Sequence, residues 1–332
     1  MNQNNYLPFV QEFVTSFFVF ILLSFIVFKF FRSFFPISIA SDRSALSHEP
    51  TLRGIGVIFP ICLIISSFLF TQNYELFNFY FLLIFISALI GFYDDLKNIN
   101  YVKKLLSLTF LFMIIVLIDN DVLLLLDINI LFSIVISLTF FIFFVLFFNQ
   151  IDGINGLSSG TFCVFLASLI FLKNNEMVST GIFINILGIV FSYFLLNILQ
   201  IKFFQGDSGA YFLGSTAYLI FQENEEILFI SLVFLFPIIG DIIWTTVMRG
   251  YFRYNLSQPH KTNLYQKSAS KIKSHFLVTF CHILIQSTCI FIIYSFQIYK
   301  ESLLIQLTSL TLFGLFFSLI YIYTSHLFNK NK

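Results

Sequence analysis

The residues from Ile128 to Phe148 form an apolar run without any charge, and the run is long enough to cross a bilayer as a helix. Similar runs recur along the chain, so that 58% of its residues are hydrophobic and only 11% are charged. A soluble globular domain averages about 25% charged residues. Because the runs are continuous and do not alternate, they favour helices over an outer-membrane barrel. The sequence therefore predicts an all-α polytopic membrane protein.

We expect about eleven transmembrane helices within a single integral membrane domain, 1–332. Sixteen Lys and Arg residues lie on one set of connecting loops, whereas Lys173 and Lys300 alone lie on the other. By the positive-inside rule, this asymmetry places the N-terminus outside and the C-terminus in the cytoplasm. An active site formed by loops is therefore expected to face the cytoplasm. The expected spans are Val14–Phe31, Gly54–Phe70, Phe77–Tyr93, Leu105–Ile118, Ile128–Phe148, Leu157–Leu172, Val178–Leu199, Ala210–Phe221, Ile227–Met248, Phe276–Phe296 and Leu303–Tyr323.

A polar stretch, Asn149–Gly160, directly follows one of these runs and reads Asn-Gln-Ile-Asp-Gly-Ile-Asn-Gly-Leu-Ser-Ser-Gly. Glycine lets a backbone turn tightly and approach a ligand, and Asn and Asp offer donors and acceptors. Taken alone, the stretch is better explained as a polar turn stabilised by Asx-type hydrogen bonds. Comparable clusters recur on the same side of the membrane, which favours a functional site here.

Two adjacent carboxylates, Asp94 and Asp95, stand where another apolar run ends. Charged residues are common at the ends of spans, but like-charged neighbours raise each other's pKa unless a cation intervenes. Mg²⁺ takes few carboxylates and completes its shell with water and phosphate oxygens. The pair is therefore a candidate magnesium site, and Lys104 nearby is a candidate partner for phosphate.

A third cluster, Gly206-Asp-Ser-Gly209, lies between two apolar runs. The same four residues surround the nucleophile of chymotrypsin-like proteases, but those enzymes are soluble β-barrels. In a membrane protein, Asp207 is better read as a metal ligand, and the glycine-flanked amides can face an anion. Phe203 or Phe204 can stack on a base.

The remaining candidates are weaker when each is taken alone. Arg53 can hold phosphate oxygens in bidentate fashion, although a basic inner loop also fits contact with anionic lipid headgroups. His260 lies in the long, basic loop Arg249–Ser274. Asp241 lies inside a span, where a carboxylate costs about 2.5–3.5 kcal/mol and is by default a functional candidate. The alternative for Asp241 is a hydrogen bond that packs helices together.

In this order the motifs resemble those of the polyprenyl-phosphate N-acetylhexosamine-1-phosphate transferases, over roughly Asp42–Lys267. Asn149–Gly160 resembles the family's Asn-x-x-Asp-Gly-x-Asp-Gly-Leu, and Lys202–Gly214 resembles its Lys-x-Phe-x-Gly-Asp-Ser-Gly. Asp94 and Asp95 match its aspartate-rich start. Pro259–Lys267 resembles the variant histidine loop of O-antigen-type members.

The sequence departs from this pattern at several positions. Asn98 stands where some members have a third acid, and Asn155 replaces the second acid of the glycine-rich motif. Asn263 and Tyr265 stand where many relatives carry histidine. The first inner loop is one residue shorter than usual and has Leu52 in place of proline. Any role that needs a carboxylate at position 155 or a cluster of histidines is thereby in doubt.

The resemblance implies transfer of a sugar 1-phosphate from a UDP-sugar to undecaprenyl phosphate, with release of UMP and initiation of a lipid-linked cell-envelope polysaccharide. It implies Mg²⁺ as the cofactor, with Mn²⁺ as the alternative ion. It also implies the bacterial cytoplasmic membrane as the location and membrane lipid as a partner. No nucleic-acid partner is expected, and a homodimer is compatible with the sequence.

The resemblance also assigns site residues. Asp207 is the first choice as metal ligand, with Asp95 or Asp94 next, and we expect Asp94 to act through metal placement more than through proton removal. Asp152 and Phe204 would hold the uridine. The full expected set is Asp94, Asp95, Asp152 and His260 as catalytic residues, Arg53, Lys104, Asn149, Asn155, Asn197 and Phe204 as substrate-binding residues, and Asp207 and Asp95 as metal ligands.

Two other classes of protein remain open at this point. A membrane scaffold with a degraded site would explain Asn155 and Asn263. A transporter would explain the many spans and Asp241, but transporters often show symmetric halves and acids near the bilayer midplane. The polar clusters of this chain gather on one side, and no internal repeat is visible in its sequence.

Overall fold

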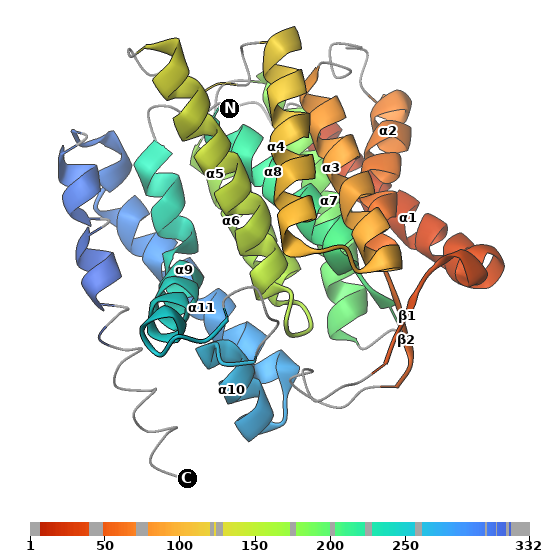
Figure 1. Cartoon of the computed structure of the whole chain (residues 1–332). Helices are drawn as coiled ribbons and strands as arrows, with labels where there is room; N and C mark the ends of the chain where they lie inside the picture. Colours follow the sequence, from red (N-terminus) through yellow and green to blue (C-terminus); the bar gives the residue numbers. More distant parts are fainter. Residues whose placement is uncertain are drawn as a thin grey trace.

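The chain folds into a bundle of helices whose connections at one end carry the polar motifs (Figure 1). The structure, a computed structural model, describes residues 7–39, 49–70, 79–119, 123, 129–172, 177–199, 203–222, 228–255, 261–302, 304–309, 311–316 and 319. The α-helices that it contains are α1 (Leu7–Ile26), α2 (Ile58–Phe70), α3 (Phe79–Lys97), α4 (Tyr101–Ile118), α5 (Ile130–Ile151), α6 (Leu157–Leu172), α7 (Met177–Ile198), α8 (Gly206–Gln222), α9 (Leu228–Tyr251), α10 (Leu264–Ile272) and α11 (His275–Ser295). Helical residues 304–309 and 311–316 follow α11.

The helical character expected from the sequence is confirmed, and the length and composition of several helices fit a multi-pass membrane protein. Within the residues that the structure describes, six helices are long and apolar enough to cross a membrane, and shorter apolar helices lie at Ile55–Leu69 and Leu157–Phe171. The number of eleven spans and the orientation of the chain stay predictions. One segment differs from expectation, because α10 is a helix inside the stretch that the sequence presents as a loop, Arg249–Ser274.

Helix α8 is the centre of the bundle, and all 17 of its residues are buried. It packs most extensively against α3 and α5. The backbones come close because glycines face them: a Cβ at Gly91 of α3 would lie 2.5 Å from the carbonyl oxygen of Asp207. A Cβ at Gly214 of α8 would likewise lie 2.4 Å from Cα of Val145 in α5. Small residues at such crossings are the usual means of close helix packing in membranes.

A small sheet, which the all-α expectation did not include, lies at the polar end of the bundle. It has the order β1 (Ile37–Ser38), β2 (Thr51–Arg53) and β3 (Phe203–Phe204). β1 and β2 are antiparallel, whereas β2 and β3 are parallel and place Arg53 opposite Phe204. The sheet therefore joins the first inner loop to the segment that leads into α8.

The crossing of α5 and α8 gives a test of the packing. We expect Gly214→Ala to destabilise the protein by about 1–3 kcal/mol, because the added methyl group has no room against the backbone of Val145. Gly250→Ala is the matched control, since a Cβ at Gly250 of α9 meets nothing within 4 Å. Thermal unfolding of both variants in one detergent measures the difference. Equal melting temperatures for the two variants would contradict this packing.

Candidate active site

The N-terminus of α8 is held by a carboxylate from another helix. Oδ1 of Asp95, in the last turn of α3, accepts the main-chain N–H of Asp207 at 2.9 Å, and Oδ2 accepts that of Ser208 at 3.1 Å. The first amides of a helix lack acceptors within the helix, and a negative charge is favourable at that end. Gly206 has φ +72°, and a Cβ there would lie 2.3 Å from Oδ2 of Asp95. The Gly-Asp-Ser-Gly motif thus begins with glycine because Asp95 occupies the space of a side chain.

Arg53 links the two carboxylates of this corner. Its Nε lies 2.7 Å from Oδ1 of Asp95, and its Nη2 lies 2.7 Å from Oδ1 of Asp207. A planar guanidinium suits such a two-sided contact, which a lysine cannot reproduce. Strand β2 places Arg53 there, because its main-chain N–H donates to the carbonyl of Pro36 at 2.9 Å and the next residue, Gly54, donates to that of Phe204 at 3.1 Å.

Lys104, near the start of α4, joins Asp94 to Asp207. Its Nζ contacts Oδ2 of Asp94 and lies 3.2 Å from Oδ2 of Asp207. The other oxygen of Asp94 accepts the N–H of Ile99 at 2.9 Å and so stabilises the turn between α3 and α4. In that turn Asn98 has φ +48°, a conformation that asparagine tolerates better than most residues. The asparagine at the position of a third acid therefore has a conformational role here.

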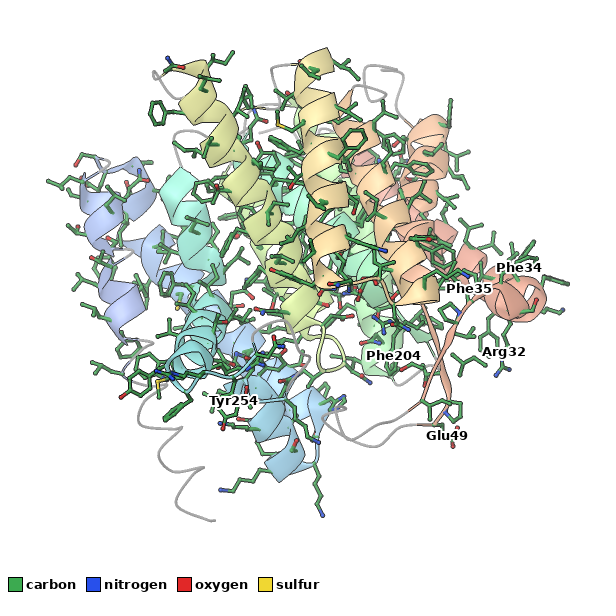
Figure 2. All side chains as sticks on the ribbon, viewed as in Figure 1. Arg32, Phe34, Phe35, Glu49, Phe204 and Tyr254 are labelled. Atoms are coloured by element: carbon green, nitrogen blue, oxygen red, sulfur yellow. The ribbon has the colours of Figure 1, made fainter. Side chains whose placement is uncertain are left out.

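Asn149, in the last turn of α5, completes the surroundings of Asp207. Its Nδ2 donates to Oδ1 of Asp207 at 3.0 Å. Asp207 thus receives contacts from β2, α4 and α5 while it lies at the start of α8. We call Arg53, Asp94, Asp95, Lys104, Asn149 and Asp207 the acid cluster. Nitrogen and oxygen atoms gather at this end of the bundle, where Phe204 is also labelled (Figure 2).

The acid cluster contains three carboxylates and two cationic side chains. Burial, together with the neighbouring Asp207, raises the pKa of Asp94 to about 7. Burial and Asp207 also raise the pKa of Asp95, whereas Arg53 and the amides of Asp207 and Ser208 lower it. Burial alone would raise the pKa of Asp207 too, but its contact with Asp94 and the charges of Arg53 and Lys104 hold that pKa below its usual range. With all five groups ionised, the acid cluster carries a net charge of −1, which favours binding of either a proton or a further cation.

Asp152 belongs to a second network beside the acid cluster. Its Oδ1 accepts the hydroxyl of Ser158 at 2.9 Å, and that hydroxyl accepts Nε2 of Gln205 at 2.7 Å. The main-chain N–H of Gln205 donates to the hydroxyl of Tyr193 at 2.8 Å. Burial raises the pKa of the half-buried Asp152, whereas the charge of Arg53 lowers it. Sequence reasoning did not single out Gln205 or Ser158, because nothing in their spacing shows that they meet.

Asn197 and Asn155 have partners within the protein. Oδ1 of Asn197 accepts the N–H of Gly156 at 2.7 Å, and its Nδ2 donates to the carbonyl of Phe203 at 3.3 Å. Nδ2 of Asn155 donates to the carbonyl of Asn197 at 3.4 Å, and the N–H of Asn155 donates to Nδ1 of His275 at 3.2 Å. Through these contacts the two asparagines connect the turn after α5 with the end of α7 and with β3. The side chain of Asn197 thus has a structural role in this structure, and its expected contact with a substrate stays a prediction.

The other expected residues are distributed as follows. Phe204 is half-buried on β3, opposite Arg53. His260 lies outside the residues that the structure describes. Asp241 does not reach the acid cluster: its carboxylate accepts the main-chain N–H groups of Leu264 and Tyr265, at 2.8 and 3.0 Å. The hydrogen-bonding alternative for Asp241 is therefore the one that the structure contains.

The described residues include no group of three or more His, Cys, Asp or Glu side chains arranged around a metal position. Oδ2 of Asp94 and Oδ2 of Asp207 nevertheless converge on one point, which the ammonium group of Lys104 occupies. Mg²⁺ is commonly bound through one or two carboxylates plus water and substrate phosphates. The chemistry of these two oxygens therefore fits such an ion. Both oxygens of Asp95 are engaged by α8, which makes Asp94 the better partner for Asp207.

Comparison with protein families gives a match to part of this chain. The family described as Glycosyl transferase family 4 matches residues 77–222. The matched stretch contains Asp94, Asp95, Lys104 and Asp207, as well as the polar stretch Asn149–Gly160, whereas Arg53 lies before it. A comparison with curated protein sequences returned no match.

The neighbouring aspartates of α3 are expected to differ in their effect on stability. Asp95→Asn places an amide where two N–H groups and a guanidinium need acceptors, so we expect a loss of about 2–4 kcal/mol. Asp94→Asn imitates the protonated acid, which burial and the neighbouring Asp207 favour by raising the pKa of Asp94, and should cost less than about 1 kcal/mol at pH 6. Thermal unfolding of both variants at pH 6 measures this difference. If Asp94→Asn is the less stable variant, the assignment of Asp95 as the cap of α8 is wrong.

Proposed function

We propose that this chain, which belongs to glycosyl transferase family 4, transfers a sugar 1-phosphate from a UDP-sugar to a polyprenyl phosphate and releases UMP. The acid cluster is the observation that supports the proposal most strongly. It brings Asp94 and Asp207 together with Arg53 and Lys104, which suits the binding of a diphosphate beside a divalent cation. By resemblance of motifs, the sugar is an N-acetylhexosamine or a derivative, and the acceptor is undecaprenyl phosphate.

The position of the cluster suits two substrates of opposite character. The donor is a charged nucleotide in water, and the acceptor is a lipid whose phosphate lies at the level of the headgroups. Residues at one end of a bundle of apolar helices can bind both at the same depth, which removes much of the entropic barrier to reaction. In the proposed orientation this end faces the cytoplasm, with the N-terminus of the chain outside. The proposed location is the bacterial cytoplasmic membrane.

The reaction itself needs no proton transfer to begin. An oxygen of the acceptor phosphate forms a bond to the phosphorus that carries the sugar, and the bond from that phosphorus to the bridging oxygen breaks. UMP leaves with the electron pair. A phosphate monoester has its second pKa near 6, so the acceptor is mostly a dianion at pH 7. The part of the protein is therefore to bind, align and stabilise negative charge, with Arg53 and Lys104 as its cationic groups.

The proposed cofactor is Mg²⁺, which neutralises charge on a diphosphate when bound. Asp94 and Asp207 are the residues that would hold it. Lys104 now pairs with both carboxylates and would be released to contact phosphate. Asn149 and Arg53 would keep Asp207 oriented through its other oxygen.

Phe204 and Asp152 are the proposed contacts of the uridine. Phe204 is half-buried, and its backbone pairs in register with Arg53, a residue expected to contact phosphate. Asp152 is half-buried in the turn after α5, and the hydroxyl of Ser158 contacts one of its oxygens. His260 is proposed as a phosphate contact on the resemblance of its loop alone.

The alternative of a degraded scaffold rests on asparagines that replace acidic or histidine residues, and their contacts favour an enzyme. Asn155 contacts the carbonyl of Asn197, and Asn263 donates to the hydroxyl of Tyr265 at 3.3 Å. Neither replacement removes a carboxylate from the acid cluster. The acid cluster keeps its three carboxylates and its two cationic side chains in the described part of the chain.

The first test is UMP release by purified protein with undecaprenyl phosphate, a panel of UDP-N-acetylhexosamines, and Mg²⁺ either present or chelated. We expect release that depends on metal and lipid, and we expect Asp207→Asn to lower kcat by about 100-fold or more. Glu301→Gln, a change at an exposed acid far along the chain, is the control and should behave as wild type. A folded protein that releases UMP from no donor would refute the proposal.

A pH profile tests whether Asp94 removes a proton. If the acidic limb reports the acceptor phosphate, the rate falls as the pH drops through about 6, because the dianion becomes protonated. Asp94→Asn should then lower the whole profile and leave that limb in place. If Asp94 is instead the essential base, with its pKa raised to about 7, the substitution removes the limb. The profile of kcat against pH for both proteins separates the two cases.

A further inference from the structure

Asp241 is the only acidic side chain of α9 among the described residues, and it builds the start of α10. Its Oδ1 accepts the N–H of Leu264 at 2.8 Å, and its Oδ2 accepts the N–H of Tyr265 at 3.0 Å. The hydroxyl of Thr245, one turn further along α9, donates to the same carboxylate at 3.2 Å. Asn263, the residue at the N-cap position of α10, makes no capping hydrogen bond with its own side chain. The first N–H groups of α10 are therefore capped by a side chain of α9 and not by the N-cap residue of α10 itself.

Helix α10 in turn holds the end of α5 through one side chain. Tyr265 is fully buried, and its hydroxyl donates to the main-chain carbonyl of Gln150. Nδ2 of Asn263 donates to the same hydroxyl at 3.3 Å. A Cβ at Gly153 would lie 2.8 Å from this hydroxyl and 2.7 Å from Nε2 of Gln266, so α10 packs tightly against the turn that follows α5.

This contact lies next to the acid cluster along the chain. Gln150 follows Asn149, whose side chain donates to Asp207, and it precedes Asp152 by two positions. The last carbonyl groups of an α-helix lack N–H donors from a following turn, because the helix ends there. The hydroxyl of Tyr265 supplies the missing donor and so determines where the last turn of α5 lies.

From these contacts we infer that Asp241 and Tyr265 are positioning residues: Asp241 orders α10, and Tyr265 on α10 holds Asn149 and Asp152 in register with Asp207. The readout in activity rests on the proposed function, whereas the structural coupling does not. The inference gives Asp241 a role in the site although it lies within a span and touches no residue of the acid cluster. It also explains why a tyrosine suits position 265, since its hydroxyl reaches a carbonyl on another helix.

The direct test is Tyr265→Phe, which removes one oxygen and leaves the ring in place. We expect kcat for UMP release to fall about tenfold, because small displacements of aligned groups are costly. KM for the UDP-sugar should rise as well, because Asp152 is a proposed contact of the uridine, whereas KM for the polyprenyl phosphate should change by less than about twofold. Tyr218→Phe is the matched control, because Tyr218 is a fully buried tyrosine of α8 whose side chain hydrogen-bonds with Ser137. Removing the hydroxyl of Tyr218 should lower the free energy of unfolding by a similar amount and leave kcat unchanged.

Asp241→Ala tests the first step of the coupling. If Asp241 acts through Tyr265, the double variant Asp241→Ala/Tyr265→Phe should be no slower than Asp241→Ala alone. Independent, multiplying losses in the double variant would overturn the link between the two residues. Should Asp241→Ala fail to fold, Tyr265→Phe remains the deciding variant.

Hydrogen exchange tests the coupling without any substrate. In Tyr265→Phe we expect faster exchange of amides in the turn after α5, including Gly156, and unchanged exchange in α8. Wild-type exchange in this turn together with wild-type kcat would overturn the inference. If wild-type protein releases no UMP from any donor, the proposed function fails, and the exchange of this turn still decides whether Tyr265 holds it.

Discussion

A buried helix needs acceptors for its first amides, and much of this site is the means by which α8 obtains them. Water cannot readily supply acceptors for these N–H groups, because every residue of the helix is buried. Asp95 supplies both acceptors, Gly206 leaves it room, and Arg53 balances its charge. Asp207 is thereby held at the first turn of the helix. The arrangement of the acid cluster depends on this cap at the start of α8.

The same solution is used a second time in α10, with a different purpose. Asp241 accepts two amides at the start of a short helix, as Asp95 does at the start of α8. In both cases the acid comes from a neighbouring helix, so each cap is also a tertiary contact. Asp95 thereby orders the acid cluster directly, whereas Asp241 acts at one remove, through Tyr265 and the end of α5. A carboxylate inside or beside a span thus has a structural explanation as strong as a catalytic one.

The sequence was sufficient to predict a helical fold of the membrane type, because continuous apolar runs of this length are typical of helices that cross a bilayer. It also predicted that Asp94, Lys104 and Asp207 would share one site, since motif order placed them on one side. The sequence could not show that Asp95 caps α8 while Asp94 contacts Lys104. Adjacent residues on a helix point in different directions, and those directions are known only once the helix is placed among its neighbours. Nor could the sequence show Tyr265 meeting Gln150, a contact between positions 115 residues apart.

The parallel pairing of β2 with β3 and the ion pair of Arg53 with Asp207 also bear on how the protein is made. The two partners are 154 positions apart, and Asp95 is synthesised 112 positions before the amide that it caps. At about 5–20 residues per second, these charged groups wait roughly ten seconds for α8 to follow. Throughout that interval Arg53 can pair with Asp95 and Lys104 with Asp94, but Asp207 is still absent. The order of synthesis therefore makes the arrival of α8 the step at which the three carboxylates and two cations of the acid cluster can first come together.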